Sequence, residues 1–167
     1  MQIAAAESPF AVLTAVVAPA LLTNSSSVLV LGLGNRIARV VDRTRTLATV
    51  MVGAENDREF YARLQYQAGL LKRRTKHLNK ALRLGYAAVG GFAGEALIAV
   101  FGGVLVHYQL PFAARLAGLL ALAIGVLSVG SLVTACVHMV RETAIALDNL
   151  DEEAKTVAME AARQLVK

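Results

Sequence analysis

The stretch that decides the fold is residues 18–45, APALLTNSSSVLVLGLGNRIARVVDRTR, an apolar run that ends in a series of arginines. Past the apolar part come Arg36, Arg39, Arg43 and Arg45. The first three recur at intervals of three and four residues, which is the spacing of one helical face. The stretch therefore predicts a membrane helix that leaves the bilayer at Arg36 and continues as a helix beyond it.

The composition of the whole chain also favours a membrane protein. Of its 167 residues, 56% are hydrophobic and 17% are charged, whereas a soluble domain usually holds about 25% charged residues. The mean hydropathy is +0.56. The single cysteine, Cys136, cannot form a disulfide within the chain. The N-terminal sequence MQIAAAESPF lacks the basic residues of a signal peptide, so we expect the first apolar segment to be retained as a span.

Three apolar runs are long enough to cross a bilayer, which takes ~20 helical residues. They cover residues 10–34, 84–106 and 112–140. Since the backbone must satisfy its own hydrogen bonds in hydrocarbon, we expect each run to be a helix. Only residues 107–111 separate the second run from the third, so these two form a tight helical hairpin, with Pro111 suited to a helix start.

The distribution of basic residues predicts the orientation of the spans. Residues 36–83 hold twelve of the seventeen Lys and Arg residues but only four acidic residues, and the 107–111 connection holds no Lys or Arg. By the positive-inside rule, we expect residues 36–83 in the cytoplasm and the N-terminus outside. Three spans then place residues 141–167, and with them the C-terminus, on the cytoplasmic side as well.

The segments outside the spans are also expected to be helical. Residues 36–83 read as a helical hairpin that turns at 53–57, with Asn56 or Asp57 as an N-cap. The apolar stripe of the C-terminal helix 141–167 comprises Leu147, Leu150, Ala154, Val157, Ala161 and Leu165. Because this segment has six acidic and four basic residues, we expect it to pack against the basic hairpin, within or between subunits. The predicted fold is all-α, a single domain of three transmembrane helices with a cytoplasmic helical bundle.

The first span carries a recognisable set of features within residues 8–47. Ala18-Pro19 lies inside the apolar helix, small polar residues follow one to two turns later, and the exit reads Asn-Arg-x-x-Arg-x-x-Asp-Arg from Asn35 to Arg43. This segment resembles a bacterial membrane-protein family known as domain of unknown function 2721. The resemblance implies a protein of the bacterial inner membrane, with a charged hairpin followed by two more spans. It implies no activity.

Five consecutive polar residues interrupt the first span: Thr23, Asn24, Ser25, Ser26 and Ser27. Because Pro19 removes one backbone hydrogen bond, nearby hydroxyl groups can satisfy the carbonyl that it frees. The same side chains can instead bond to neighbouring helices. A third interpretation is a pore lining, in which only two or three of them can take part because five residues point in every direction around a helix.

Glu95 lies near the middle of the second span. A carboxyl group at that depth is costly unless it is paired, protonated or hydrated, so intramembrane acids are functional candidates. In a channel, we expect Glu95 to be the electrostatic element, with Asn24 and some of Ser25, Ser26 and Ser27 as polar lining. The alternative is a neutral Glu95 that is hydrogen-bonded to a neighbouring helix. Arg115 is a poor partner, because it lies near the outer end of the third span and can extend to the interface.

Small residues recur at intervals of four in the second and third spans. The pairs are Gly90 with Gly94, Ala99 with Gly103, and Ala114 with Gly118. Such pairs let membrane helices approach closely. They indicate tight packing within the subunit, a homo-oligomeric interface, or both.

The sequence contains no constellation for covalent, metal or acid–base catalysis, so we expect no enzyme, no catalytic residue and no cofactor. His138 lies two residues from Cys136, but a metal site needs more ligands at suitable spacing. The basic run at 72–76 suits anionic lipid headgroups, and without interleaved aromatic residues it does not indicate nucleic-acid binding. We expect a homo-oligomeric ion channel or pore, or alternatively a non-conducting scaffold that recruits partners through its cytoplasmic helices.

Overall fold

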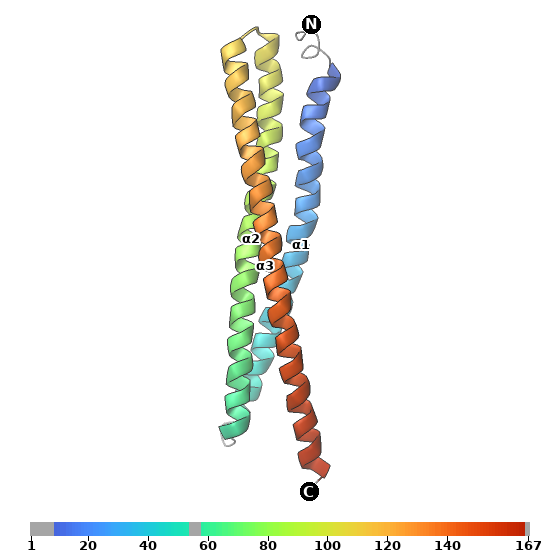
Figure 1. Ribbon diagram of the computed structural model, residues 1–167, viewed down its shortest axis with the longest axis vertical. Helices are drawn as coiled ribbons and strands as arrows, with labels where there is room; N and C mark the ends of the chain where they lie inside the picture. Colours follow the sequence, from blue (N-terminus) through green and yellow to red (C-terminus); the bar gives the residue numbers. More distant parts are fainter. Residues whose placement is uncertain (1–8, 54–57, 166–167) are drawn as a thin grey trace. The chain divides into compact units, whose positions relative to one another are not determined.

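A computed structural model describes residues 9–53 and 58–165 and consists of three long helices (Figure 1). Their bounds are Pro9–Gly53 for α1, Arg58–His107 for α2 and Pro111–Leu165 for α3. All secondary structure in the described ranges is helical, which confirms the predicted all-α class. Each helix contains a segment that is long and apolar enough to cross a membrane.

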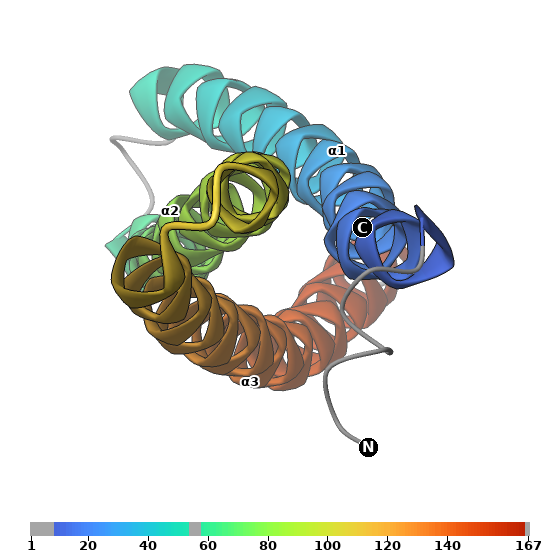
Figure 2. The same cartoon turned by 90° about the horizontal axis from the view of Figure 1, so that it is seen from above.

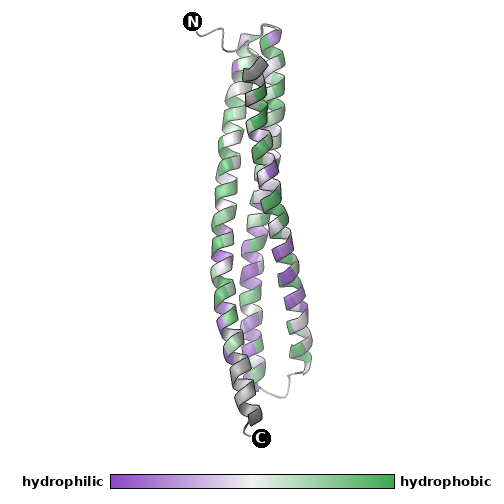
Figure 3. Cartoon of the chain, turned by 90° about the vertical axis from the view of Figure 1, so that its right-hand side faces the viewer, coloured by the Kyte–Doolittle hydropathy of each residue, from purple (hydrophilic) through white to green (hydrophobic). Residues whose placement is uncertain are grey.

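Each helix joins an apolar part and a charged part without a break, and in α2 the charged part comes first. α1 continues past Arg36 to Gly53, which confirms that the helix does not stop at the first arginines. The segments expected as a third span and a separate C-terminal helix form one helix, α3. Figure 3 shows hydrophilic residues concentrated in the second half of α1 and the first half of α2. The expected N-cap at Asn56 or Asp57 lies outside the described residues.

The helices build two compact units, and every helix contributes to both. Unit 1 combines α1 up to Gly32 with Leu82–Ala135 of α2 and α3. Unit 2 combines Leu33–Ala81 of α1 and α2 with α3 from Cys136 onward. The predicted mid-span acid belongs to unit 1, and most of the basic residues belong to unit 2.

Buried positions repeat every seven residues along each helix. They are Ser26, Leu33, Val40 and Leu47 in α1, Leu64, Leu71, Leu78, Gly85 and Phe92 in α2, and Ser128, Ala135 and Glu142 in α3. This interval is the repeat of core positions in helices that pack side by side. Three of these core positions hold a polar side chain, at Ser26, Ser128 and Glu142, and these mark where packing is not purely apolar.

The connection between α2 and α3 is three residues long and closes its own hydrogen bonds (Figures 1 and 2). The backbone N–H of Gln109 donates to the carbonyl of Val106, and that of Leu110 donates to Leu105, both at 3.0 Å. Gln109 has a φ of 53°. This is a Schellman motif with a left-handed residue after the helix end. α3 then starts at Pro111, as expected.

α2 and α3 approach closely at Gly91. A Cβ atom at Gly91 would lie 1.9 Å from the Oγ and 3.1 Å from the Cβ of Ser128. The glycines expected to mediate packing behave differently, since a Cβ at Gly90, Gly94 or Gly118 would meet nothing within 4 Å. The helix contact within the chain is therefore offset by one residue from the predicted Gly90–Gly94 pair, which is left open.

We expect Gln109→Gly to stabilise the hairpin. Glycine adopts a positive φ without the Cβ clash that costs other residues roughly 1–2 kcal/mol. Thermal unfolding in detergent should show a higher Tm for this variant, whereas Gln109→Ala, which keeps a Cβ, should show no gain. A lower Tm for Gln109→Gly would mean that the glutamine side chain itself holds the turn.

We expect Gly91→Ala to destabilise the protein by about 1–3 kcal/mol, because the added methyl overpacks the contact with Ser128. Gly90→Ala is the matched control. It adds the same methyl one residue earlier, into open space, and should be neutral or stabilising by up to about 1 kcal/mol through helix propensity. Equal Tm values for the two variants would contradict the close approach at Gly91.

Candidate functional site

Glu95 lies in unit 1 on α2, beside a cavity of about 320 Å³. The other lining residues are Leu22, Phe92, Leu122, Gly125, Val126 and Val129. All of these are apolar or glycine, so the carboxyl group stands alone as a polar side chain in the lining. Glu95 is half-buried. Among residues 9–53 and 58–165, its carboxylate has no hydrogen-bond or ion-pair partner, so the bond required by the neutral, hydrogen-bonded alternative is absent there.

Gly125 of α3 provides the space that the Glu95 carboxylate occupies. A Cβ atom at Gly125 would lie 2.8 Å from Oε1 and 2.9 Å from Oε2 of Glu95. Any larger residue at this position would displace the carboxylate. The Glu95 carboxylate on α2 therefore fits against α3 only because position 125 has no side chain.

The hydroxyl groups near Pro19 bond within their own helix. Thr23 donates to the carbonyl of Pro19 at 2.7 Å, and Ser27 donates to the carbonyl of Thr23 at 2.8 Å. Because Pro19 lacks an N–H, the carbonyl that loses its donor is that of Ala15, one turn earlier. The Thr23 hydroxyl therefore does not replace the lost hydrogen bond at the Ala15 carbonyl, contrary to the expectation from sequence. Its bond satisfies the hydroxyl itself in apolar surroundings.

The rest of the polar stretch is divided between the surface and the core of unit 1. Asn24 and Ser25 are exposed, as is Ser27. Ser26 is 1% exposed, and its Oγ has no hydrogen-bond partner among the described residues. An unpaired buried hydroxyl costs about 1–3 kcal/mol. None of the five polar residues lines the Glu95 cavity, to which α1 contributes Leu22.

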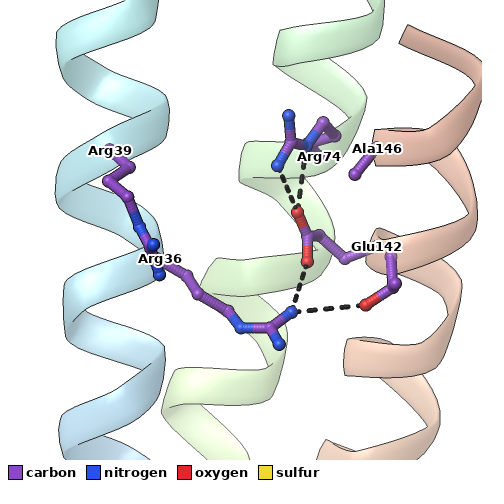
Figure 4. A pocket seen from close by; sticks show the side chains of 6 residues that line it. Arg36, Arg39, Arg74, Glu142 and Ala146 are labelled. Carbon is purple, nitrogen blue, oxygen red and sulfur yellow. Dashed lines mark hydrogen bonds and ion pairs between the residues drawn. The ribbon is translucent and has the colours of Figure 1, made fainter. Parts of the chain in front are cut away.

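A buried ion cluster joins all three helices in unit 2 (Figure 4). Glu142 of α3 is 1% exposed. Its Oε2 lies 3.2 Å from Nη1 of Arg36 on α1, and its Oε1 accepts from Nε and Nη2 of Arg74 on α2 at 2.9 and 2.8 Å. Two charged donors compensate the carboxylate for the water that it loses on burial. We call these three residues the ion triad.

The seven-residue repeat explains the position of the ion triad. Glu142 follows Ala135 by seven residues, so α3 directs it into the core. Arg36 and Arg74 are not core residues, since their side chains are 40% and 22% exposed. They reach inward with long side chains to meet the carboxylate. Arg36 also donates to the hydroxyl of Thr143 at 3.3 Å.

The three arginines predicted at the membrane interface have different environments. Arg36 belongs to the ion triad, and Arg43 is exposed. Arg39 is exposed and contributes to a pocket of about 280 Å³. This pocket, which we call the arginine pocket, is lined by Arg36, Arg39, Arg74, Glu142, Thr143 and Ala146.

Two histidines meet one turn from the ion triad. The Nδ1 atoms of His77 and His138 are 3.1 Å apart, and the ring centroids are 5.4 Å apart. One Nδ1 must donate and the other accept for this contact to be a hydrogen bond. Cys136 is exposed. Within the part of the chain that the structure describes, no group of three or more His, Cys, Asp or Glu residues could hold a metal ion.

The acidic tail was expected to pack on the basic hairpin within or between subunits, and within the subunit this contact is seen at one point. Glu142 makes the contact within the subunit. Leu147, Leu150 and Ala154 of the stripe are exposed. The side chains of its remaining members, Val157, Ala161 and Leu165, lie outside the described ones.

Sequence reasoning missed Glu142, Arg74 and the His77–His138 contact. The signal for Glu142 was the interval Ser128, Ala135, Glu142, which continues the core repeat across the end of the apolar run. The two histidines carried no such signal, because their contact depends on the register between α2 and α3.

A family model described as "Protein of unknown function (DUF2721)" matches residues 16–152. No curated protein and no solved structure matches the chain.

We expect Glu142→Ala to destabilise unit 2 strongly. Breaking a buried ion pair costs about 3–5 kcal/mol, and the low end applies here because both arginines can regain water. Glu59→Ala is the control, since Glu59 pairs with Arg63 at 2.8 Å on the exposed surface of α2, where such pairs contribute about 0.3–0.5 kcal/mol. Thermal unfolding followed by circular dichroism measures both variants. Similar Tm losses would contradict a special role for the buried carboxylate.

Proposed function

The chain belongs to the DUF2721 family of proteins of unknown function, and we propose that it is a small homo-oligomeric ion channel or pore with Glu95 as its ion-contacting group. The proposed location is the bacterial inner membrane. The N-terminus lies outside, and the charged parts of the helices form a bundle on the cytoplasmic side.

The observation that carries the proposal is the carboxylate of Glu95, which has no partner among the described residues and lies beside an apolar-lined cavity. A carboxyl group in the hydrocarbon region requires a counter-charge, a proton or water. Gly125 keeps the space in front of the carboxylate free of a side chain. A passing cation or proton would supply the charge that the described part of the chain does not.

Assembly of several copies is supported by how little of the apolar surface is covered. In the most apolar windows of α2 and α3, only 6% of the residues are buried. Gly90 and Gly94 offer a small-residue pair with open space in front of it. A helix of another copy can approach closely at such a pair. An oligomer would also shield the Glu95 carboxylate from lipid.

The orientation rests on charge. Twelve of the seventeen Lys and Arg residues lie between residues 36 and 83. Basic residues next to membrane spans are retained on the cytoplasmic side. We assign no catalytic step and no cofactor to this arrangement.

A second candidate function is a non-conducting scaffold that recruits partners through the cytoplasmic helices. Its support is the exposed position of Leu147 and Leu150 on α3. Leucines one turn apart on an uncovered helix face are typical of helix–helix recognition. In this case Glu95 would be a contact within the assembly and would not conduct ions.

The deciding experiment starts with the oligomeric state of the purified protein in nanodiscs, measured by native mass spectrometry. We expect a closed ring of four or more copies. Conductance of the wild type and of Glu95→Gln is then recorded in planar bilayers. Glu95→Gln keeps the size of the side chain and removes its charge, so we expect conductance to fall or ion selectivity to change.

Glu59→Gln is the matched control, because it makes the same substitution on α2 outside the apolar run and should leave conductance unchanged. A monomer or dimer would contradict the hypothesis of a central pore. A ring without conductance, or one with equal conductance in the wild type and Glu95→Gln, would favour the scaffold.

A further inference from the structure

We propose that the arginine pocket of unit 2 binds a phosphate group. Three arginines and one glutamate contribute to its lining, so its formal charge is positive. The pocket holds about 280 Å³, which is just below the ~300–1,000 Å³ typical of sites for drug-sized ligands. Its size and charge suit a small anionic group.

The arginines have donors left for a ligand. Arg36 bonds to Glu142 and Thr143 through Nη1, and Arg74 bonds to Glu142 through Nε and Nη2. Since a guanidinium group carries five N–H donors, Nη2 of Arg36 and Nη1 of Arg74 remain available. Arg39 makes no hydrogen bond or ion pair with the other described residues, so its whole guanidinium is available.

Glu142 positions this set of donors and does not neutralise it. Its two oxygens hold Arg36 and Arg74 from opposite sides, as Figure 4 shows. Arginines that are already fixed lose less conformational entropy when a ligand binds. The planar guanidinium fork matches the geometry of phosphate oxygens.

Two sources can supply the phosphate group, a lipid headgroup or a soluble phosphate. Arg36 is the first basic residue after the apolar run of α1, so in the proposed orientation the pocket lies at the level of the cytoplasmic headgroups. Basic pockets at this level bind anionic headgroups. The test must therefore separate the two sources.

The experiment measures retention of phosphatidylglycerol by the purified full chain in detergent, using native mass spectrometry. Diacylglycerol, which lacks the phosphate, is the reference lipid, and inorganic phosphate is the soluble competitor. Arg39→Gln removes one donor and leaves the ion triad intact. We expect it to weaken binding about tenfold, as for the loss of one charge-assisted hydrogen bond.

Two further variants make the test specific. Ala146→Leu fills the pocket without changing its charge and should also weaken retention. Arg45→Gln removes a charge from an exposed residue of α1 outside the pocket and should leave retention unchanged. Thermal unfolding of each variant confirms that it is folded.

The outcomes separate clearly. A lipid source is supported if the protein retains phosphatidylglycerol preferentially, if Arg39→Gln and Ala146→Leu both weaken this retention, and if inorganic phosphate does not displace the lipid. Displacement of the lipid by inorganic phosphate, with the same effects of the variants, supports a soluble source. Equal retention of both lipids, or an equal loss in Arg45→Gln, overturns the proposal. Since Glu95 lies in unit 1, this result is independent of the conductance test.

Discussion

A single carboxylate constrains three helices at once in unit 2. Glu142 sits at a core position of α3 and is bonded to an arginine from α1 and another from α2. Rotating or sliding any one of these helices would remove a partner and leave a buried charge exposed to an apolar core. The ion triad therefore fixes the register of the three helices in unit 2. Leucines that repeat every seven residues would specify this register less strictly, because they can pack in more than one register.

Unit 1 has the opposite character. The buried hydroxyl of Ser26 and the half-buried carboxylate of Glu95 have no partner among the described residues, whereas the buried hydroxyl of Ser128 donates to the carbonyl of Ile124. Most of the apolar surface of unit 1 is uncovered. The contact at Gly91 and Ser128 draws α2 and α3 together but covers little of that surface. Unit 2 satisfies its buried carboxylate within one chain, whereas unit 1 leaves two polar side chains without a partner among the described residues and much apolar surface uncovered.

The helices could be predicted from sequence because apolar runs and charge boundaries are local signals. Apolar length located three helices that are long and apolar enough to cross a membrane. The spacing of Arg36, Arg39 and Arg43 correctly indicated a helix that continues past Arg36. Glu95 was recognisable because a lone acid interrupts an apolar run. Contacts between helices were harder to predict from sequence, because they depend on the rotation of each helix about its axis and on the register between helices. Gly91 was passed over for Gly90. Glu142 was not singled out among the six acidic residues of the tail, although it continues the core repeat of α3.

For the proposed membrane protein, the short turn after α2 also affects how the chain would insert into a bilayer. Its backbone N–H groups at Gln109 and Leu110 are already bonded to carbonyls of α2, so the turn carries few unpaired polar groups into hydrocarbon. Three residues cannot separate the two helix ends. α2 and α3 are therefore suited to insert as one preformed hairpin, with Arg115 as the single charged residue between Glu95 and Arg141 that must be carried along. In the proposed orientation, translocation of this hairpin would be one cooperative event instead of two independent crossings.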